Sequence, residues 1–161
     1  MTTSSDKKIY LLDTNVLINF SLWLPIACHD TFWAKLAESL ARGEWVLLDL
    51  VIKEIRYSPD LQKWCKEQER SSLVKAVGDD HKSRGVEINS QYKMIDEATQ
   101  KSTVDTYIIA YAEANKLVVF SRESAMKPNG PLYKIPDVCS ALGVERIAKP
   151  EVFLKAINFK N

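Results

Sequence analysis

Three acidic residues of this sequence, Asp13, Glu54 and Asp105, each stand beside an apolar stretch, where a strand or a helix is expected to begin or end. Asp13 directly follows the apolar run at residues 9–12, which is typical of a strand buried in a sheet. Glu54 comes shortly after a second such run. Asp105 falls in the first turn of a strong helix predicted at residues 103–115, on the face that carries apolar side chains. We therefore expect all three carboxylates to point toward the interior side of their elements.

A group of carboxylates in such places predicts a site for a divalent cation. Buried carboxylates without partners are unfavourable, and several together repel one another. Mg²⁺ or Mn²⁺ supplies positive charge, takes oxygen ligands and lowers the pKa of a bound water that can attack a phosphodiester. Glu123, which follows a third apolar run at residues 117–121, is the fourth candidate acid of this site.

Each acid also has a purely structural interpretation. Asp13 fits as the cap of the helix expected directly after it. Asp105 lies three residues after Ser102, a spacing that resembles a capping box. Glu54 and Glu123, each taken alone, fit a solvated helix position and a loop position. The recurrence of an acid at four such places favours one shared site over four unrelated roles.

Strands and helices alternate along the chain, which predicts the α/β class with a central, mainly parallel sheet and helices on both faces. We expect a mobile polar loop at residues 79–85 and a loop leading into a short helix at residues 134–143. The predicted strands are residues 9–13, 45–48, 117–121 and 145–148, and the other predicted helices are residues 14–22, 31–41, 50–55, 59–69, 88–100, 103–115 and 150–158.

Length and composition indicate a single domain at residues 9–161, preceded by a polar arm at residues 1–8. The arm lacks the apolar core of a signal peptide, and no apolar run is long enough to span a membrane. The net charge of +1 excludes a polybasic nucleic-acid binder, so any such binding must use a local patch. Three separated cysteines, Cys28, Cys65 and Cys139, fit reduced thiols and a cytoplasmic protein.

Four segments occur in the order of the conserved motifs of PIN domains. Residues 12–18 resemble the opening motif, residues 51–55 the second, residues 104–112 the third, and residues 117–123 the strand that leads to the fourth site. The order and rough spacing fit across nearly the whole chain. The tail at residues 134–144, which contains Lys-Ile-Pro-Asp-Val-Cys, resembles an uncharacterised PIN-like branch that is often grouped with toxin–antitoxin modules.

The resemblance implies a three-layer α/β/α PIN-like fold and a metal-dependent endoribonuclease, of the kind that serves as the toxin of VapBC-type pairs. Asp13, Glu54 and Asp105 would then bind Mg²⁺ or Mn²⁺ and activate water. The fourth position of the family usually reads Thr-x-Asp, but this chain has Ser-Arg-Glu at residues 121–123. The longer Glu123 leaves open whether that carboxylate contacts the metal directly or through water. The implied partners are an RNA substrate, a cognate antitoxin protein and a second copy of the chain.

Several neighbours of the acids are candidates for supporting roles. Thr14, Asn15 and Ser121 are expected to orient metal ligands or to contact phosphate. Arg122 is a candidate for binding RNA phosphates, with an ordinary solvated arginine as the alternative. Asp137 is a reserve acid for the site, or else caps the short helix that follows it.

Two other functions are compatible with parts of this pattern. The first is a non-catalytic PIN-like module that binds RNA or assembles with protein, which the altered fourth position favours. The second is a phosphotransfer receiver domain, but such domains need an acidic pair at the first strand, where this chain has a single acid.

The tryptophans are expected in the core or at a helical interface, rather than in base stacking. They are Trp23, Trp33, Trp45 and Trp64.

Overall fold

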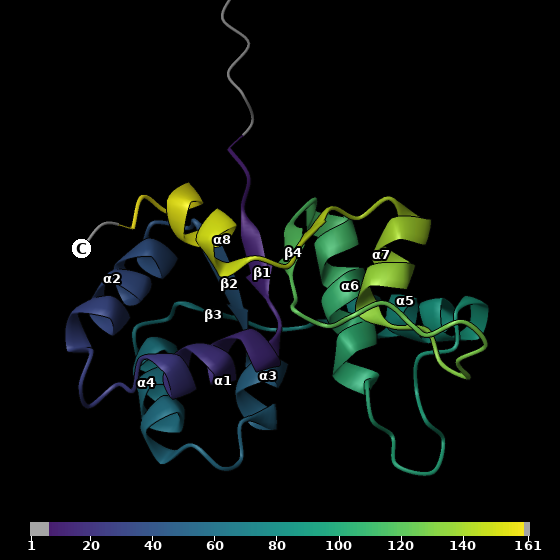
Figure 1. Cartoon of the computed structure of the whole chain (residues 1–161), viewed down its shortest axis with the longest axis horizontal. Coiled ribbons are helices and arrows are strands. Elements are labelled where there is room, and N and C mark those ends of the chain that lie inside the picture. Colours follow the sequence, from purple (N-terminus) through teal and green to yellow (C-terminus); the bar gives the residue numbers. More distant parts are fainter. Residues whose placement is uncertain (1–6, 160–161) are drawn as a thin grey trace, which may run out of the picture.

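Five short strands form one sheet at the centre of the computed structural model, which describes residues 7–159 (Figure 1). The strand order is β3-β2-β1-β4-β5, and every described pair of neighbouring strands is parallel. The predicted α/β class with a parallel sheet is therefore confirmed. The strands are β1 (Tyr10–Leu12), β2 (Trp45–Leu48), β3 (Val74–Lys75), β4 (Val118–Phe120) and β5 (Arg146–Ile147).

Helices cover both faces of this sheet, so the three-layer arrangement is also confirmed. Figure 1 shows α1, α2, α4 and α8 to one side of the strands, and α5, α6 and α7 to the other. Among the described residues, the helices are α1 (Thr14–Trp23), α2 (Asp30–Ala41), α3 (Asp49–Glu54), α4 (Pro59–Arg70), α5 (Asp79–Gln91), α6 (Thr103–Asn115), α7 (Ile135–Leu142) and α8 (Pro150–Ala156). None of these helices is long and apolar enough to cross a bilayer.

The register between the two central strands decides which polar residues meet. In the pairing of β1 with β4, Leu12 lies opposite Phe120, and the Asp13 N–H donates to the Phe120 carbonyl at 3.0 Å. All residues of both strands are buried and apolar, as expected for the middle of a parallel sheet. The residues that follow the two strands, Asp13 and Ser121, are consequently brought side by side at the carboxyl edge of the sheet.

Aromatic side chains fill the core on the side of α1, α2 and α4. Trp33, Trp45 and Trp64 are all buried, and the Trp33 and Trp64 rings meet edge to face at 5.1 Å. The core interpretation of these three tryptophans is confirmed. Trp33 and Trp64 therefore pack against each other within one chain, and these two side chains are not free to form an exposed apolar face. Trp23 differs, because nearly half of its surface is exposed.

The segment expected to be a mobile loop, residues 79–85, is the first half of α5. This helix packs against α6, and Arg84 pairs with Glu113 across the contact at 2.8 Å. Gly85 is buried at the crossing, where an added Cβ would lie 2.6 Å from the Tyr107 ring. Gly85 is therefore no turn residue. Its missing side chain lets two helices approach closely, and this long-range reason for a glycine leaves no local signal in the sequence.

Two neighbouring predictions also need correction. The helix predicted at residues 88–100 is wrong beyond Gln91, where α5 ends; the chain then turns, with the Asn89 side chain accepting from the Met94 and Ile95 N–H groups at 2.9 Å. The edge strand β3 was not predicted, because two residues are too few to show the alternation of apolar and polar side chains that marks a strand. All three cysteines are free thiols, as expected. The predicted polar arm lies outside the described residues except for its last two positions.

The contact between α5 and α6 gives a test of the fold. Replacing Gly85 by alanine favours a helix by up to about 1 kcal/mol, but the clash with Tyr107 is an overpacking that costs about 1–3 kcal/mol. We expect Gly85→Ala to lower the free energy of unfolding by about 1 kcal/mol, measured by urea denaturation. The matched control, Ser83→Ala, is exposed on the same helix and should change stability by less than about 0.5 kcal/mol. A Gly85→Ala protein more stable than the wild type would contradict this packing.

Candidate functional site

Asp13 is the most buried of the candidate acids, with only 3% of its surface exposed. It stands between β1 and α1, and its Oδ2 accepts a hydrogen bond from the Ser121 hydroxyl at 3.0 Å. Ser121 is fully buried at the end of β4. The side chain of Asp13 makes no capping hydrogen bond to α1, so its placement is not explained by the capping alternative. The supporting role predicted for Ser121 is consistent with this contact.

Glu54 ends α3 and approaches the same edge of the sheet through Thr14. The buried Thr14 hydroxyl donates to the Glu54 Oε1, which ties the end of α3 to the first turn of α1. Glu54 is exposed along much of its side chain, but partial desolvation of its carboxylate raises its pKa, while the Thr14 hydrogen bond and the charge of Arg56 oppose the rise. Thr14 thus orients this carboxylate, a contact consistent with the supporting role predicted for it.

Asp105 enters the site from the first turn of α6. The helix is preceded by Ser102 in a left-handed conformation at φ 72°, and Ser102 makes no side-chain capping bond. The capping-box alternative therefore does not account for Asp105. The Ser102 side chain instead lowers the pKa of Asp105, against the larger effect of burial. Asp105 is half-buried, and the residues behind it, Thr106 and Ile108, are fully buried.

Glu123 borders the site from the loop after β4 and is already engaged. Its Oε2 accepts the Ile135 N–H at 3.2 Å, and its Oε1 lies 3.7 Å from the Lys134 ammonium. Its own N–H donates to the Ser121 hydroxyl oxygen at 3.2 Å, which continues the chain of contacts from Asp13. This anchoring fits an indirect contribution of Glu123, such as contact through water, better than a free metal ligand.

The pKa values show that these acids influence one another. Burial raises the pKa of Asp105 from 3.8 to about 7, and the charges of Asp13, Glu123 and Glu54 add to the rise. Burial likewise raises the pKa of Asp13 to about 6, with added repulsion from Glu123 and Glu54 and an opposing hydrogen bond from Ser121. Asp105 therefore lies within electrostatic reach of Asp13, Glu54 and Glu123, which come from other parts of the chain.

The donor chemistry of this group fits a hard divalent cation. The groups present are carboxylate and hydroxyl oxygens, which Mg²⁺ and Mn²⁺ prefer. The two raised pKa values mean that Asp13 and Asp105 lack the positive neighbour that would keep them charged. In the described part of the chain, no three or more acidic, cysteine or histidine side chains stand close enough to hold a metal ion as they are. Binding would thus require side-chain rotations that bring these carboxylates closer together.

The other candidates lie at the margin of this site or have structural partners. Asn15 is exposed on α1, one turn before Asn19. Asp137 accepts the Met126 and Lys134 N–H groups at 2.9 and 3.0 Å, so it fixes the loop and the start of α7 rather than facing the other acids freely. Its interpretation as a local cap is the better one.

Arg122 turns away from the acids. Its guanidinium lies 4.6 Å from the centre of the Trp23 ring, and its Nη1 donates to the Asn19 side chain at 3.0 Å. The sequence did not point to Asn19 or Trp23 as parts of a site. The one available signal was the spacing of Asn15, Asn19 and Trp23 at four-residue steps, which places them along one face of α1.

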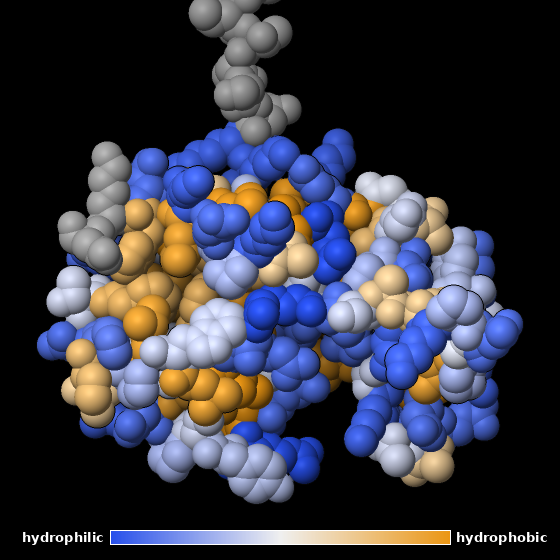
Figure 2. Space-filling view, in the orientation of Figure 1, coloured by the Kyte–Doolittle hydropathy of each residue, from blue (hydrophilic) through white to orange (hydrophobic). Residues whose placement is uncertain are grey.

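The surface is notched where the acid-bearing elements meet. Figure 2 shows a hollow in the outline between the region of α3 and the start of α6, with mostly hydrophilic residues at its borders. Glu54 is the last residue of α3, and Asp105 lies in the first turn of α6, so both acids belong to elements that border this hollow.

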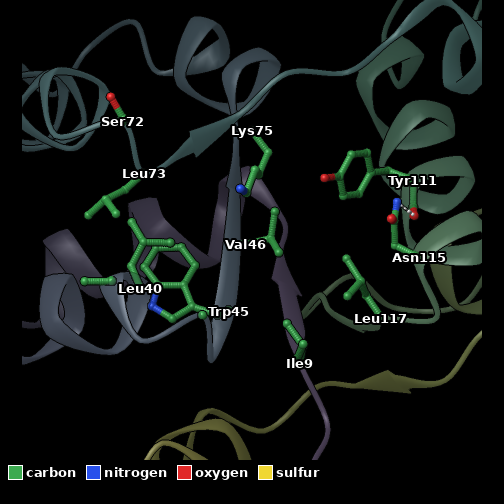
Figure 3. A pocket seen from close by; sticks show the side chains of 12 residues that line it. Ile9, Leu40, Trp45, Val46, Ser72, Leu73, Lys75, Tyr111, Asn115 and Leu117 are labelled. Atoms are coloured by element: carbon green, nitrogen blue, oxygen red, sulfur yellow. Dashed lines mark hydrogen bonds between the residues drawn. The ribbon is translucent and has the colours of Figure 1, made fainter.

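A separate cavity of about 370 Å³ lies at the opposite, amino-terminal edge of the sheet (Figure 3). Ile9, Trp45 and Leu117 line it near the starts of β1, β2 and β4, and Tyr111 projects over it from α6. Its lining contains no acidic residue. This cavity is consequently not the predicted metal site, and the acids at the other edge remain the candidate for chemistry.

The fold and the site together define an α/β protein with an acidic group at the carboxyl edge of a parallel sheet. The chain belongs to the family described as DUF4411, domain of unknown function, whose profile matches residues 10–160. No protein among those with curated descriptions matches it.

The raised pKa values predict how the metal-free protein responds to pH. The folded state binds protons to Asp13 and Asp105 more tightly than the unfolded chain, whose aspartates titrate near 3.9. Their stabilising contribution is therefore complete below about pH 4 and is lost as the pH rises to about 7. We expect Asp13→Asn to be more stable than the wild type at pH 8 in EDTA, by roughly 1–3 kcal/mol, with less advantage at pH 5.

The measurement is urea denaturation at pH 5, 6, 7 and 8. The matched control, Glu151→Gln, removes an exposed charge at the start of α8 and should not change the pH dependence. If Asp13→Asn instead loses stability at every pH, Asp13 serves the fold rather than a charged site.

Proposed function

We propose that this protein is a metal-dependent endoribonuclease that hydrolyses RNA phosphodiester bonds. The observation that carries the proposal is the burial of Asp13 and Asp105 within reach of the charges of Glu54 and Glu123. Buried carboxylates lower the stability of a small domain. Their presence therefore favours a functional use of the charge. The PIN-like sequence motifs, which contain the same four acids, support the same function.

Asp13, Glu54 and Asp105 would hold the cation, with Glu123 at its border. The chemistry that Mg²⁺ or Mn²⁺ would supply there is neutralisation of the carboxylates, activation of a water and withdrawal of charge from a phosphate. The protein's own part is orientation: Ser121 fixes the Asp13 carboxylate, and Thr14 fixes that of Glu54. Such supporting hydrogen bonds keep ligands in a productive direction.

The nucleophile in this proposal is water, because neither a histidine nor a buried cysteine of residues 7–159 offers an alternative near the acids. Its two histidines are placed elsewhere: His29 is exposed before α2, and the His81 ring packs on Tyr111 at 4.8 Å and accepts the Gly78 N–H. Cys65 and Cys139 are buried, and burial raises the pKa of both thiols to about 12, which leaves them unreactive.

RNA as the substrate, a role as the toxin of a toxin–antitoxin pair, homodimerisation and a cytoplasmic location all rest on the resemblance to VapC-like PIN domains. A non-catalytic module that binds RNA or assembles with protein is the second candidate. The observation that favours it is Glu123, whose carboxylate is already bound by the Ile135 N–H and by Lys134.

The direct test is RNA cleavage by the purified protein. We expect the wild type to cut single-stranded RNA in Mn²⁺ or Mg²⁺ and to stop when EDTA is added. Asp13→Ala and Asp105→Ala should each reduce the rate at least about 100-fold, because each removes a ligand of the cation, whereas Glu123→Gln should reduce it less. Glu151→Gln is the control that removes a distant acid.

Cleavage that persists in EDTA, or equally in Asp13→Ala, would point to a contaminating nuclease. If wild type and Asp13→Ala are both inert on varied RNAs in Mn²⁺, the non-catalytic module replaces the enzyme as the better account.

A further inference from the structure

We propose that Arg122 and Trp23 form a stacking platform that binds one nucleobase of a single-stranded RNA beside the acid site. The inference deepens the proposed function by assigning a substrate contact, and it rests on that function for the identity of the nucleic acid. The platform is defined as the Arg122 guanidinium together with the Trp23 ring beneath it.

The platform is exposed and is held in place from below. Trp23 has 47% of its surface exposed, although the three other tryptophans are buried. The Trp23 ring meets Phe20, a core residue, edge to face at 6.1 Å. Arg122 lies over the ring at 4.6 Å, and Asn19 accepts from its Nη1 at 3.0 Å, which limits rotation of the guanidinium. A flat group that is already positioned loses little freedom when a base stacks on it.

The charge of Arg122 is available to a ligand. Within residues 7–159 the guanidinium forms no ion pair with a carboxylate, and its hydrogen bond goes to the neutral amide of Asn19. An arginine that served only to stabilise the surface would gain more from an acidic partner. A guanidinium plane stacks on nucleobases, and its free N–H groups can also bind phosphate oxygens.

The platform is linked to the acid site by two short routes along the chain. Arg122 is the residue between Ser121 and Glu123, and both of these contact the acid site. Trp23 ends α1, which begins directly after Asp13 and is about 15 Å long. Asn15 and Asn19 precede Trp23 on the same face of α1 and offer amide groups between the two places. A single strand crossing the acids can therefore reach the platform within a few nucleotides.

The nature of the surface favours single-stranded RNA over another protein chain. Beside Trp23, Leu22 is exposed as well, so an apolar protein contact is the competing occupant. However, a protein partner would be expected to bury Trp23 directly, whereas here a cation covers one of its faces. Nucleobases stack on exposed aromatic and guanidinium planes without sequence preference. The bases of a single strand are free to do so, whereas those of a duplex are already stacked on one another.

The test measures RNA binding by fluorescence anisotropy in EDTA, so that no cleavage occurs. The probe is a labelled eight-nucleotide single-stranded RNA, compared with an RNA duplex of the same length at fixed salt. Arg122→Lys keeps the charge but loses the plane, and Trp23→Leu keeps an apolar side chain but loses the ring. We expect each to weaken single-strand binding about 5- to 100-fold and to leave duplex binding unchanged. Arg70→Lys, on exposed α4 surface, is the matched control and should have no effect.

A second readout reports contact directly. Single-stranded RNA should quench the tryptophan emission of the wild type, and this quenching should be lost in Trp23→Leu, because the remaining three tryptophans are buried. Thermal melting of each variant checks that the fold is retained. These readouts do not depend on turnover: platform-dependent binding without any cleavage in Mn²⁺ would refute the nuclease and leave the platform standing.

Three results would overturn the platform. The first is an affinity of Arg122→Lys and Trp23→Leu for single-stranded RNA that equals the affinity of the wild type. This result would overturn the platform even if the wild type cleaves RNA. The second is an absence of any RNA binding by the wild type. The third is a change of oligomeric state, rather than of RNA affinity, in both variants, which would identify the surface as a contact between protein chains.

Discussion

The burial of two carboxylates, Asp13 and Asp105, beside further acids is the constraint that the rest of the structure must accommodate. Asp13 and Asp105 have raised pKa values because burial disfavours their charged forms and because each is exposed to the charge of the other acids. Such a cluster opposes folding at neutral pH, so the surrounding structure must hold it in place. The parallel register of β1 and β4 does so, by setting Asp13 beside the fully buried Ser121.

The rest of the architecture serves the same edge of the sheet. The end of α3 is tied to the start of α1 by the hydrogen bond between Thr14 and Glu54, and the close packing of α5 on α6 supports the helix that presents Asp105. The opposite edge of the sheet carries a cavity with no acidic lining. Two positive side chains lie at the margin of the acid site: Lys134 pairs with Glu123, and Arg122 lies over the Trp23 ring. This distribution suits a negatively charged polymer whose phosphate reaches the acids while its neighbours contact the margin.

Much of the fold and the identity of the acids could be predicted, because both leave local patterns. The buried strands β1, β2 and β4 are short apolar runs, and an acid after such a run is visible without any knowledge of contacts. The first half of α5 could not be predicted, since its polar sequence and Gly85 read as a loop until α6 is placed against it. The engagement of Glu123 by Lys134 and the stacking of Arg122 on Trp23 were also out of reach. Each depends on where a side chain turns, and the second joins residues far apart in the sequence.

If Asp13 and Asp105 bind one cation together, calorimetric titration with Mn²⁺ at pH 6.5 will detect it. Because both aspartates bind protons in this range, metal binding should release protons, visible as a dependence of the binding heat on the ionisation heat of the buffer. We expect saturable binding with proton release in the wild type, and at least about tenfold weaker binding in the Asp13→Asn, Asp105→Asn double variant. Equal affinity in the two proteins, or no binding by the wild type at millimolar Mn²⁺, would contradict a shared cation site.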